Sequence, residues 1–333
     1  MKKTIVNICR LLLAVVFLFS GFVKANDPIG MAYKIADYCA AFGIPSLDWV
    51  NIVLAVSLAC FEFVLGCCLF LKRKSASWLM LVVMVFLTAL TAYIYVKNPV
   101  SDCGCFGDAI ILTNAQTLAK NCILLFAALV LVVWYRHLKF FFSRKWGWSV
   151  ALLAFVAVLA YSVYSLLYLP VIDFRPYKVG FDMNERVEIP GEEANGVKAT
   201  RYDAAGFYVQ TTDGDDITYE LFESEGPVFV VVAPNLSEAS DGNVGEINNL
   251  YEYSKLNGNP FYFLTASDEQ QREEWREETD AEYPFCLSDD RVLKTIVRAN
   301  PGLVVIDHGV IVSKSGNLTL GNEINQLIHK INQ

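Results

Sequence analysis

The chain has 333 residues, of which 54% are hydrophobic and 19% are charged. This composition excludes a disordered chain, and a single soluble domain of roughly 150 residues would fill only half of the length. The charge is unevenly divided, since residues 1–170 hold 14 Lys and Arg against 6 Asp and Glu, whereas residues 171–333 hold 13 against 29. Because phosphates attract basic surfaces, the acidic second part argues against a nucleic acid partner.

Five apolar stretches in the first part are long enough to span a bilayer, which takes about 20 residues. In chain order they are residues 4–23, 49–71, 77–96, 115–135 and 148–169. We expect the first four to form an all-α transmembrane bundle and the fifth to tether it to the second part. The predicted domains are therefore the bundle at 1–146, the tether at 147–170 and a separate domain at 171–333.

Basic residues predict how these spans are oriented. They precede the first span and lie between the second and third and between the fourth and fifth: Lys2, Lys3, Lys72, Arg73, Lys74, Arg136, Lys139, Arg144 and Lys145. By the positive-inside rule these segments are cytoplasmic, and five spans place the second part outside the cytoplasm. We expect a multi-pass protein of the inner membrane, in contact with membrane lipid, whose last domain is periplasmic or otherwise extracytoplasmic. A cleaved signal peptide over residues 1–25 is an alternative that leaves this orientation unchanged.

In the second part, strand-like runs alternate with helical patterns. Strands are predicted at 228–233, 260–265, 303–307 and 310–314, and the last two form a hairpin around His308 and Gly309. Helices are predicted at 240–256, 269–278, 289–298 and 324–331, and short strands with turns at 187–218. This order indicates an α/β domain with a mixed sheet.

The most specific local motif is Asp102-Cys103-Gly104-Cys105-Phe106-Gly107-Asp108, in the outer loop between the third and fourth spans. Glycines permit tight turns, so the two cysteines can approach each other. A disulfide across one residue closes a small strained ring, and strained disulfides are the labile, oxidising ones. We predict a redox pair; a structural disulfide, including one to Cys39, and a weak metal site stay open as alternatives. Two cysteines with no nearby His are too few for a closed zinc site, so no metal is predicted.

Glu62 is the one acidic residue inside a predicted span, and an ionisable group at that depth is a candidate functional residue. It either relays protons or contacts a quinone headgroup, or else it is protonated or paired with a neighbouring helix and only fixes the packing. Gly66 would allow such a helix to approach closely. Cys286 is the one cysteine of the second part, and we expect a buried thiol, with a redox role as the alternative. The cysteines inside the spans are expected to pack as small apolar side chains: Cys9, Cys60, Cys67, Cys68 and Cys122.

Residues 1–140 resemble two related membrane families. The run Leu18-Phe19-Ser20-Gly21-Phe22-Val23-Lys24, followed by Asp27-Pro28 and Tyr33-Lys34, resembles the start of the DoxX family. The Cys-Gly-Cys-Phe-Gly-Asp loop resembles that of its relative, the methylamine-utilisation protein MauE. The resemblance implies a four-helix bundle, with Cys103 and Cys105 at the positions of the family loop. MauE-type proteins are associated with disulfide formation beside a thioredoxin-like partner, and DoxX-type relatives with thiosulfate oxidation and a quinone acceptor.

Residues 171–333 resemble a thioredoxin-like domain, through the segments 283–289 and 300–309. Pro301 matches the proline that is cis in that fold, an isomer that is uncommon elsewhere. The redox dithiol of the fold would follow the strand at 228–233, near Leu236 and Ala239, and residues 234–239 contain no cysteine. We therefore predict a degenerate thioredoxin-like domain that lacks the CxxC motif and has no thiol nucleophile at that place.

Together these observations predict an integral membrane protein that takes part in thiol–disulfide exchange in the cell envelope. Cys103 and Cys105 are the predicted redox pair, an extracytoplasmic thiol protein is the predicted partner, and quinone is a candidate acceptor. Two alternatives stay open: a non-catalytic scaffold that presents a thioredoxin-like binding domain, and a quinone-linked oxidoreductase subunit that depends on Glu62. Five spans with one intramembrane acid give little support for a transporter.

Overall fold

The structure is a computed structural model that describes residues 1–71, 74–100, 102–138, 147–183, 188–189, 201–202, 207–218, 220–224 and 226–331. The chain divides into two compact units. The first comprises Met1–Leu166 and Pro170–Ile172, and the second comprises Leu167–Leu169 and Asp173–Gln333. Much of the evidence for the predicted orientation lies outside the described residues, namely Lys72, Arg73, Lys139, Arg144 and Lys145.

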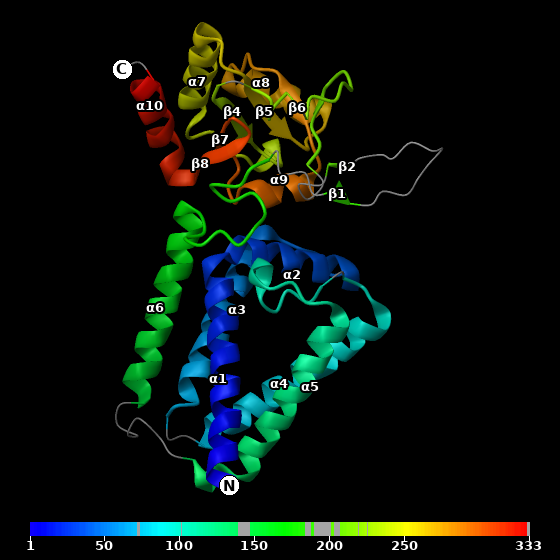
Figure 1. Cartoon of the computed structure of the whole chain (residues 1–333), viewed down its shortest axis with the longest axis vertical. Helices are drawn as coiled ribbons and strands as arrows, with labels where there is room; N and C mark the ends of the chain where they lie inside the picture. Colours follow the sequence, from blue (N-terminus) through cyan, green and yellow to red (C-terminus); the bar gives the residue numbers. More distant parts are fainter. Residues whose placement is uncertain are drawn as a thin grey trace. The chain divides into compact units, whose positions relative to one another are not determined.

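The described part of the first unit is helical (Figure 1). Its α-helices are α1 (Lys2–Asn26), α2 (Pro28–Phe42), α3 (Asp48–Cys68), α4 (Lys74–Lys97), α5 (Asn114–Val133) and α6 (Gly147–Tyr168). All of these except α2 are long and apolar enough to cross a membrane. The five predicted spans are therefore confirmed as helices, and the chain is a multi-pass membrane protein.

Helix α2 was not among the predicted elements, although its two ends are well defined. Asp27 caps its start, where the side-chain Oδ1 accepts a hydrogen bond from the Gly30 N–H at 2.8 Å, and Pro28 occupies the first turn. Gly43 ends the helix in the left-handed conformation at φ 67°, as glycine does at many helix ends. The segment between the first two spans is therefore a helix that follows α1 directly.

Helices α1 and α3 pack closely because a glycine on each meets the backbone of the other. A Cβ atom at Gly21 would lie 2.6 Å from the Phe63 nitrogen, and one at Gly66 would lie 3.0 Å from the Leu18 nitrogen. This agrees with the prediction that Gly66 allows a close helix approach, and it identifies α1 as the neighbour. Small residues have the same role in other membrane helix pairs.

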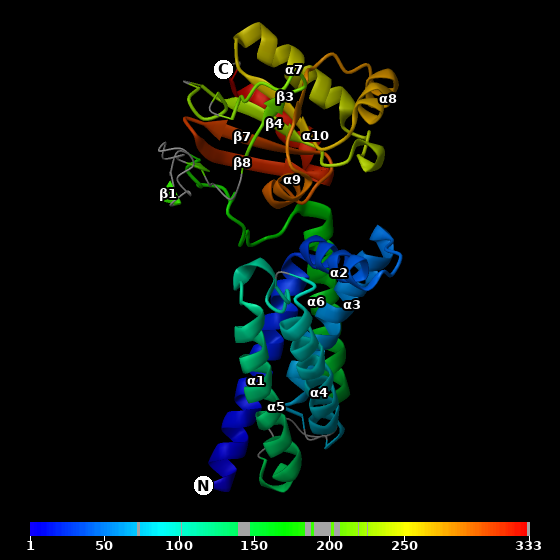
Figure 2. The same ribbon diagram turned by 90° about the vertical axis from the view of Figure 1, so that its right-hand side faces the viewer.

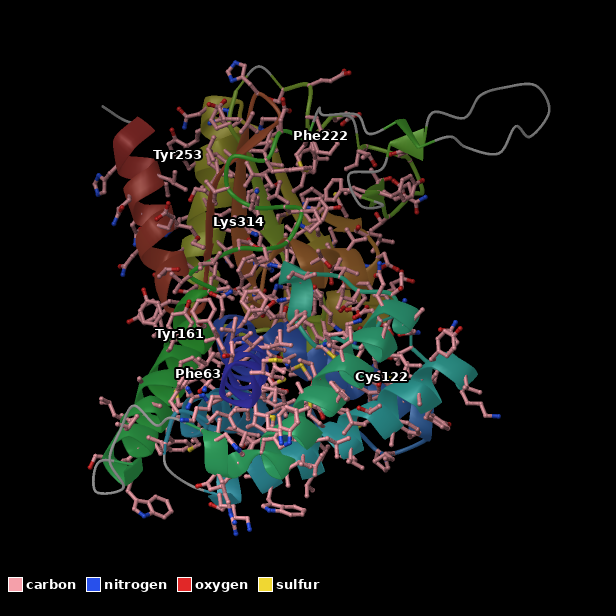
Figure 3. The ribbon with its side chains drawn as sticks, turned by 60° about the horizontal axis from the view of Figure 1, so that its bottom comes forward. Phe63, Cys122, Tyr161, Phe222, Tyr253 and Lys314 are labelled. Carbon is pink, nitrogen blue, oxygen red and sulfur yellow. The ribbon has the colours of Figure 1, made fainter. Side chains whose placement is uncertain are left out.

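Helix α6 contacts the same pair of helices through a small apolar cluster. Val158 of α6 is buried with Ala25 and Ala59, and Phe63 and Tyr161 pack against them, as their labelled side chains in Figure 3 show. The Tyr161 hydroxyl also donates a hydrogen bond of 2.9 Å to the Asn26 side-chain oxygen. The fifth span is thus attached to the bundle by specific contacts in its C-terminal half.

The second unit is built on a mixed six-stranded sheet in the order β3-β6-β5-β4-β7-β8. Figure 2 shows β7 and β8 of this sheet side by side. Strands β4, β5 and β6 are parallel, whereas β3, β7 and β8 are antiparallel to their neighbours. The strands are β3 (Gln210–Thr211), β4 (Val228–Val232), β5 (Phe261–Thr265), β6 (Phe285–Leu287), β7 (Gly302–Asp307) and β8 (Val310–Gly316). The predicted mixed sheet is confirmed, and β6 is an addition to it.

Helices cover both faces of this sheet. On one face α7 (Val244–Asn257), α8 (Glu269–Thr279) and α10 (Leu320–Ile331) bury Phe229 and Val231 of β4. On the other face α9 (Asp290–Ile296) packs with Val228, Val230 and Val232. This alternation of side chains along a fully buried strand is the two-residue period of β-structure.

The hairpin and the proline of the second unit occur where the sequence places them. Strands β7 and β8 pair across a turn in which His308 and Gly309 have φ values of 51° and 76°. The Asn300–Pro301 peptide bond directly before β7 is cis. Within the predicted strand-and-turn segment at 187–218, the described residues form β1 (Glu188–Ile189), which pairs with β2 (Arg201–Tyr202), and β3; the rest of that segment before residue 207 lies outside the described residues.

Candidate thiol site

Cys103 and Cys105 lie together in the loop between α4 and α5. Their sulfur atoms are 2.8 Å apart, and both residues are thiols, as are the other seven cysteines of the chain. Both are half-buried. A disulfide bond is about 2.05 Å long, so only a small movement separates this arrangement from a bonded pair.

The turn of the loop depends on Gly104. Its φ of 65° is a value that favours glycine, and a Cβ atom there would lie 3.1 Å from Cγ of Lys34. The Gly104 N–H donates a hydrogen bond of 2.9 Å to Oδ1 of Asp102, whose Oδ2 binds the Lys34 ammonium at 2.6 Å. The Asp102 carboxylate therefore connects the tight turn to α2.

The backbone of each cysteine is held by a different helix. Tyr38 of α2 donates a hydrogen bond of 3.1 Å to the Cys103 carbonyl oxygen. The Cys105 carbonyl oxygen accepts two hydrogen bonds from α1, each 2.7 Å long, from the Ser20 hydroxyl and the Lys24 ammonium. These contacts fix both ends of the Cys-Gly-Cys turn.

Lys24 belongs to a buried ion pair with Glu62 of α3. Its ammonium lies 2.8 Å from Oε2 of Glu62 and 2.7 Å from the Ser20 hydroxyl oxygen. With the Cys105 carbonyl, these acceptors match the three N–H donors of a lysine. The side chains of Lys24 and Glu62 are 3% and 8% exposed, so the charges are shielded from water.

A second lysine reaches the loop from α5. The ammonium of Lys120 lies 4.3 Å from the centre of the Phe106 ring, an attractive cation–π distance. Phe106 is buried and also contacts the Phe19 ring, with centroids 5.4 Å apart. The residue after Cys105 thus anchors the loop between α1 and α5 and brings a positive charge to it.

These surroundings separate the acidities of the two thiols. The pKa of Cys105 is lowered to about 6, mainly by the hydrogen bond that its sulfur shares with Cys103; burial opposes this shift, whereas the charges of Lys120 and Lys24 add to it. The Glu62 carboxylate acts in the opposite direction. The pKa of Cys103 is raised by the same hydrogen bond and by burial. The surroundings therefore favour the thiolate at Cys105 over Cys103, and the thiolate is the reactive form of cysteine.

Three of the predicted site residues are brought together in this unit: Cys103, Cys105 and Glu62. The link between Glu62 and the loop is Lys24, which the sequence analysis named only as the last residue of the run that resembles the DoxX family. Tyr38 and Lys120 were likewise missed, because nothing in their local sequence marks them as neighbours of the loop. Proton relay and quinone contact by Glu62 stay predictions, and its pairing with a neighbouring helix is observed.

The remaining cysteines are distributed over other parts of the fold. Cys39 is a half-buried thiol on α2, next to Tyr38, and Cys122 is exposed on α5 (Figure 3). Cys286 lies in β6, is 3% exposed, and has a pKa raised to about 11 by burial and by the charge of Glu220. Burial and a high pKa both oppose thiolate chemistry at Cys286.

The described residues hold no cluster of three or more His, Cys, Asp or Glu side chains that would bind a metal ion. In the second unit, the place of the expected dithiol is a short turn after β4. Leu236 is buried there, and the Asn235 carbonyl accepts a hydrogen bond of 2.7 Å from the Asn300 side chain. The absence of CxxC at residues 234–239 is a property of the sequence, and its functional meaning stays a prediction.

Residues 2–134 match the family model described as methylamine utilisation protein MauE. The match covers α1 to α5 and includes the Cys-Gly-Cys loop. Among curated proteins, none matches this chain. The resemblance to the DoxX family remains a prediction from the sequence.

Solved structures similar to this chain include three thiol–disulfide proteins. The first is a thiol:disulfide interchange protein from a Bacteroides species, with 18% identity over 38% of this chain and 86% of that one, at a TM-score of 0.32. The second is the thioredoxin domain of a thiol-disulfide oxidoreductase from Bacteroides vulgatus (17% identity, 37% of this chain, 92% of that chain, TM-score 0.30). The third is a secreted disulfide oxidoreductase from Mycobacterium tuberculosis (14% identity, 37% of this chain, 95% of that chain, TM-score 0.30). The second unit is an α/β domain built on a mixed sheet.

Proposed function

We propose that the protein carries out thiol–disulfide exchange through Cys103 and Cys105, on the extracytoplasmic side of the membrane. The observation that carries the proposal is the pair itself: two thiols with sulfur atoms 2.8 Å apart, of which Cys105 has a pKa lowered to about 6. One thiolate beside one protonated thiol is the arrangement that exchange requires, because the first attacks and the second resolves.

The exchange proceeds in two balanced steps. The Cys105 thiolate attacks one sulfur of a partner disulfide, so that a mixed disulfide forms and the other partner sulfur leaves as a thiolate. Cys103 then attacks the Cys105 sulfur, the Cys103–Cys105 bond forms, and the second partner sulfur leaves. The proton of Cys103 passes to a departing thiolate, and two electrons move from the pair to the partner. In the reverse direction the Cys103–Cys105 disulfide oxidises a partner dithiol.

The surroundings of the pair favour the oxidising direction. Interactions that stabilise the Cys105 thiolate stabilise the reduced form, and a pair with a stabilised reduced form is a stronger oxidant. Lys24 and Lys120 act in this sense. The partner is then an extracytoplasmic protein that presents two thiols, and the second unit is a candidate surface for binding it. We include in the proposal that a membrane quinone re-oxidises the Cys103–Cys105 pair, although the structure describes no quinone contact.

Mixed-disulfide trapping in membranes tests this function. In a Cys103→Ser variant Cys105 can still attack the disulfide form of the partner, but the resolving thiol is gone. A covalent complex with that partner is therefore expected on non-reducing gels and disappears with reductant. The matched Cys105→Ser variant should trap far less, because burial still raises the pKa of the remaining Cys103 thiol. If neither variant traps a partner and both only reduce the amount of protein, the cysteines are structural and the protein is a scaffold.

A further inference from the structure

The Lys24–Glu62 ion pair touches the thiol site without taking part in electron transfer. Lys24 contacts the backbone of Cys105, and Glu62 contacts Lys24. Both side chains lie almost wholly out of water, which weakens the screening of their charges. A buried ion pair is weak evidence for stability, because desolvation can exceed the attraction between the charges. Its position against the reactive cysteine therefore calls for a functional explanation.

Hydrogen bonds connect the Lys24–Glu62 ion pair to the backbone of Cys105. Ser20 and Lys24 stand one helical turn apart on α1, and both donate to the Cys105 carbonyl. The Ser20 hydroxyl also accepts from Lys24, which closes a small network around that carbonyl oxygen. Glu62 holds the Lys24 ammonium from the side of α3 at 2.8 Å. Any change at Glu62 thus reaches Cys105 through Lys24.

We propose that Lys24 and Glu62 are opposed positioning residues for Cys105: Lys24 holds its backbone and stabilises its thiolate, whereas Glu62 holds Lys24 in place and weakens that stabilisation. The proposal rests on the proposed function and adds a control of its reactivity. Opposite charges at short range shift an acidity in opposite directions. The two residues therefore set how much thiolate Cys105 presents, and with it how oxidising the pair is.

Other charged and titratable groups face the loop and must be separated from this effect. They are Lys120 from α5, Tyr38 and Lys34 from α2, and Asp102 and Cys103 within the loop. Lys34 and Asp102 neutralise each other at 2.6 Å. Lys120 adds a positive charge; its described contact is with the Phe106 ring, whereas that of Glu62 is with Lys24. Changes at Lys24 and Glu62 are thus measured against a constant background.

The test is the pH dependence of Cys105 alkylation in the full-length protein in membranes. A Cys103→Ser background prevents disulfide closure and keeps a hydroxyl donor beside Cys105, and mass spectrometry of peptides separates Cys105 from the other thiols. Glu62→Gln keeps an oxygen that accepts from Lys24, and we expect it to lower the pKa of Cys105 by about one unit, or about tenfold in the ionisation constant. Lys24→Gln should raise it by a similar amount, and the double variant should return close to the starting value.

A purely structural role would give a different pattern. Loss of packing would shift all three variants in the same direction, or would leave the pKa unchanged, and either result would overturn the proposal. Matched controls remove a charge of each sign at exposed positions of the same unit, Lys97→Gln on α4 and Asp48→Asn on α3, and should leave the Cys105 profile unchanged. If Lys24→Gln does not accumulate, Lys24→Arg keeps the charge and should leave the pKa in place, and Glu62→Gln alone still decides the sign.

The result is distinguishable from a failure of the proposed function. Exchange between the intact Cys103–Cys105 pair and a glutathione buffer tests that function without either substitution. If Cys103 and Cys105 exchange with glutathione but the Glu62→Gln and Lys24→Gln variants shift the pKa of Cys105 in the same direction, only the proposed role of Lys24 and Glu62 is wrong. If the variants shift in opposite directions but the pair is inert toward glutathione, the electrostatics are correct and the exchange function is wrong.

Discussion

The Lys24 ammonium lies 2.7 Å from the carbonyl oxygen of Cys105, although 81 positions separate the two residues in the chain. Through this contact a buried charge inside the helix bundle reaches a cysteine of the loop between α4 and α5. The same ammonium binds Glu62, so the one intramembrane carboxylate among the predicted spans is part of the thiol site. The site is therefore a single network that α1, α3 and the loop build together.

The first prediction concerns the pH profile of the reduced protein. Because only the thiolate is alkylated and the pKa of Cys105 is lowered to about 6, its alkylation rate should be half-maximal near pH 6 and level above pH 7. An ordinary cysteine thiol ionises near 8.5. Pulsed alkylation with peptide mass spectrometry measures this, with Cys103 in the same peptide as the slow reference. A midpoint above pH 8 for Cys105 would contradict the described environment.

The second prediction concerns Gly104. Gly104→Ala should weaken closure of the Cys103–Cys105 bond, because alanine at φ 65° costs about 1–2 kcal/mol and its Cβ would meet Lys34 at 3.1 Å. That cost corresponds to a factor of roughly 5 to 30 in the equilibrium between dithiol and disulfide. Gly43→Ala is the matched control, since Gly43 has a φ of 67° and open space around it. Equal effects of the two substitutions would show that the loop geometry is not what matters.

The third prediction concerns Tyr38. The Tyr38→Phe change removes the hydroxyl that binds the Cys103 carbonyl and that lowers the pKa of Cys103. The resolving step should slow, because less Cys103 thiolate is available, and a mixed disulfide at Cys105 should last longer. Quenched-flow trapping with a model disulfide measures its lifetime. Tyr93→Phe on α4, which removes a hydroxyl from an exposed ring, should leave the lifetime unchanged.

The fourth prediction concerns a buried charge cluster in the second unit. Asp173 binds Arg175 through both carboxylate oxygens and binds Lys314 at 2.7 Å. Burial and the neighbouring Arg175 lower the pKa of Lys314 to about 8 despite Asp173, so the Lys314 charge is poorly accommodated. Asp173→Ala, which strands two buried cations, should destabilise the unit by about 3–5 kcal/mol, whereas Lys314→Met should change its stability by about 1 kcal/mol or less.

Hydrogen exchange of β7 and β8 in the full-length protein measures both effects. The Asp173→Ala variant should show faster exchange across both strands, and the Lys314→Met variant should resemble the parent protein. Comparable destabilisation by the two substitutions would mean that Lys314 contributes more than its acidity indicates.

The sequence predicted the elements that rest on long or strongly periodic patterns. The five spans are long and predominantly apolar, and β4 and the hairpin of β7 and β8 are rich in β-branched residues. Helix α2 was missed because it has 15 residues and was judged only as a connection between spans. Its signals were nevertheless present, with Asp27 and Pro28 at its start and Gly43 at its end. Strand β6 has three residues, too few for any period to be recognised.

The sequence predicted the two cysteines and Glu62 of the site, but not the lysine that connects them. Spacing alone marked Cys103 and Cys105, and an isolated charge in an apolar span marked Glu62. Lys24 lies in the last turn of α1. A lysine at the end of a membrane helix usually reaches the interface, so its local sequence gave no reason to place it in a buried pair. Its partner stands 38 positions away on α3. That contact follows from the close approach of α1 and α3, which the sequence indicated at Gly66 without identifying the neighbouring helix.

The most direct test of the account is a redox titration of the purified full-length protein against glutathione buffers, read at Cys103 and Cys105 by alkylation and mass spectrometry. Exchange through this pair predicts one reversible two-electron transition, in which both thiols disappear together and Cys39, Cys122 and Cys286 are unchanged. A pair that stays fully oxidised or fully reduced across the whole range, or a disulfide that forms between Cys39 and either residue, would contradict it.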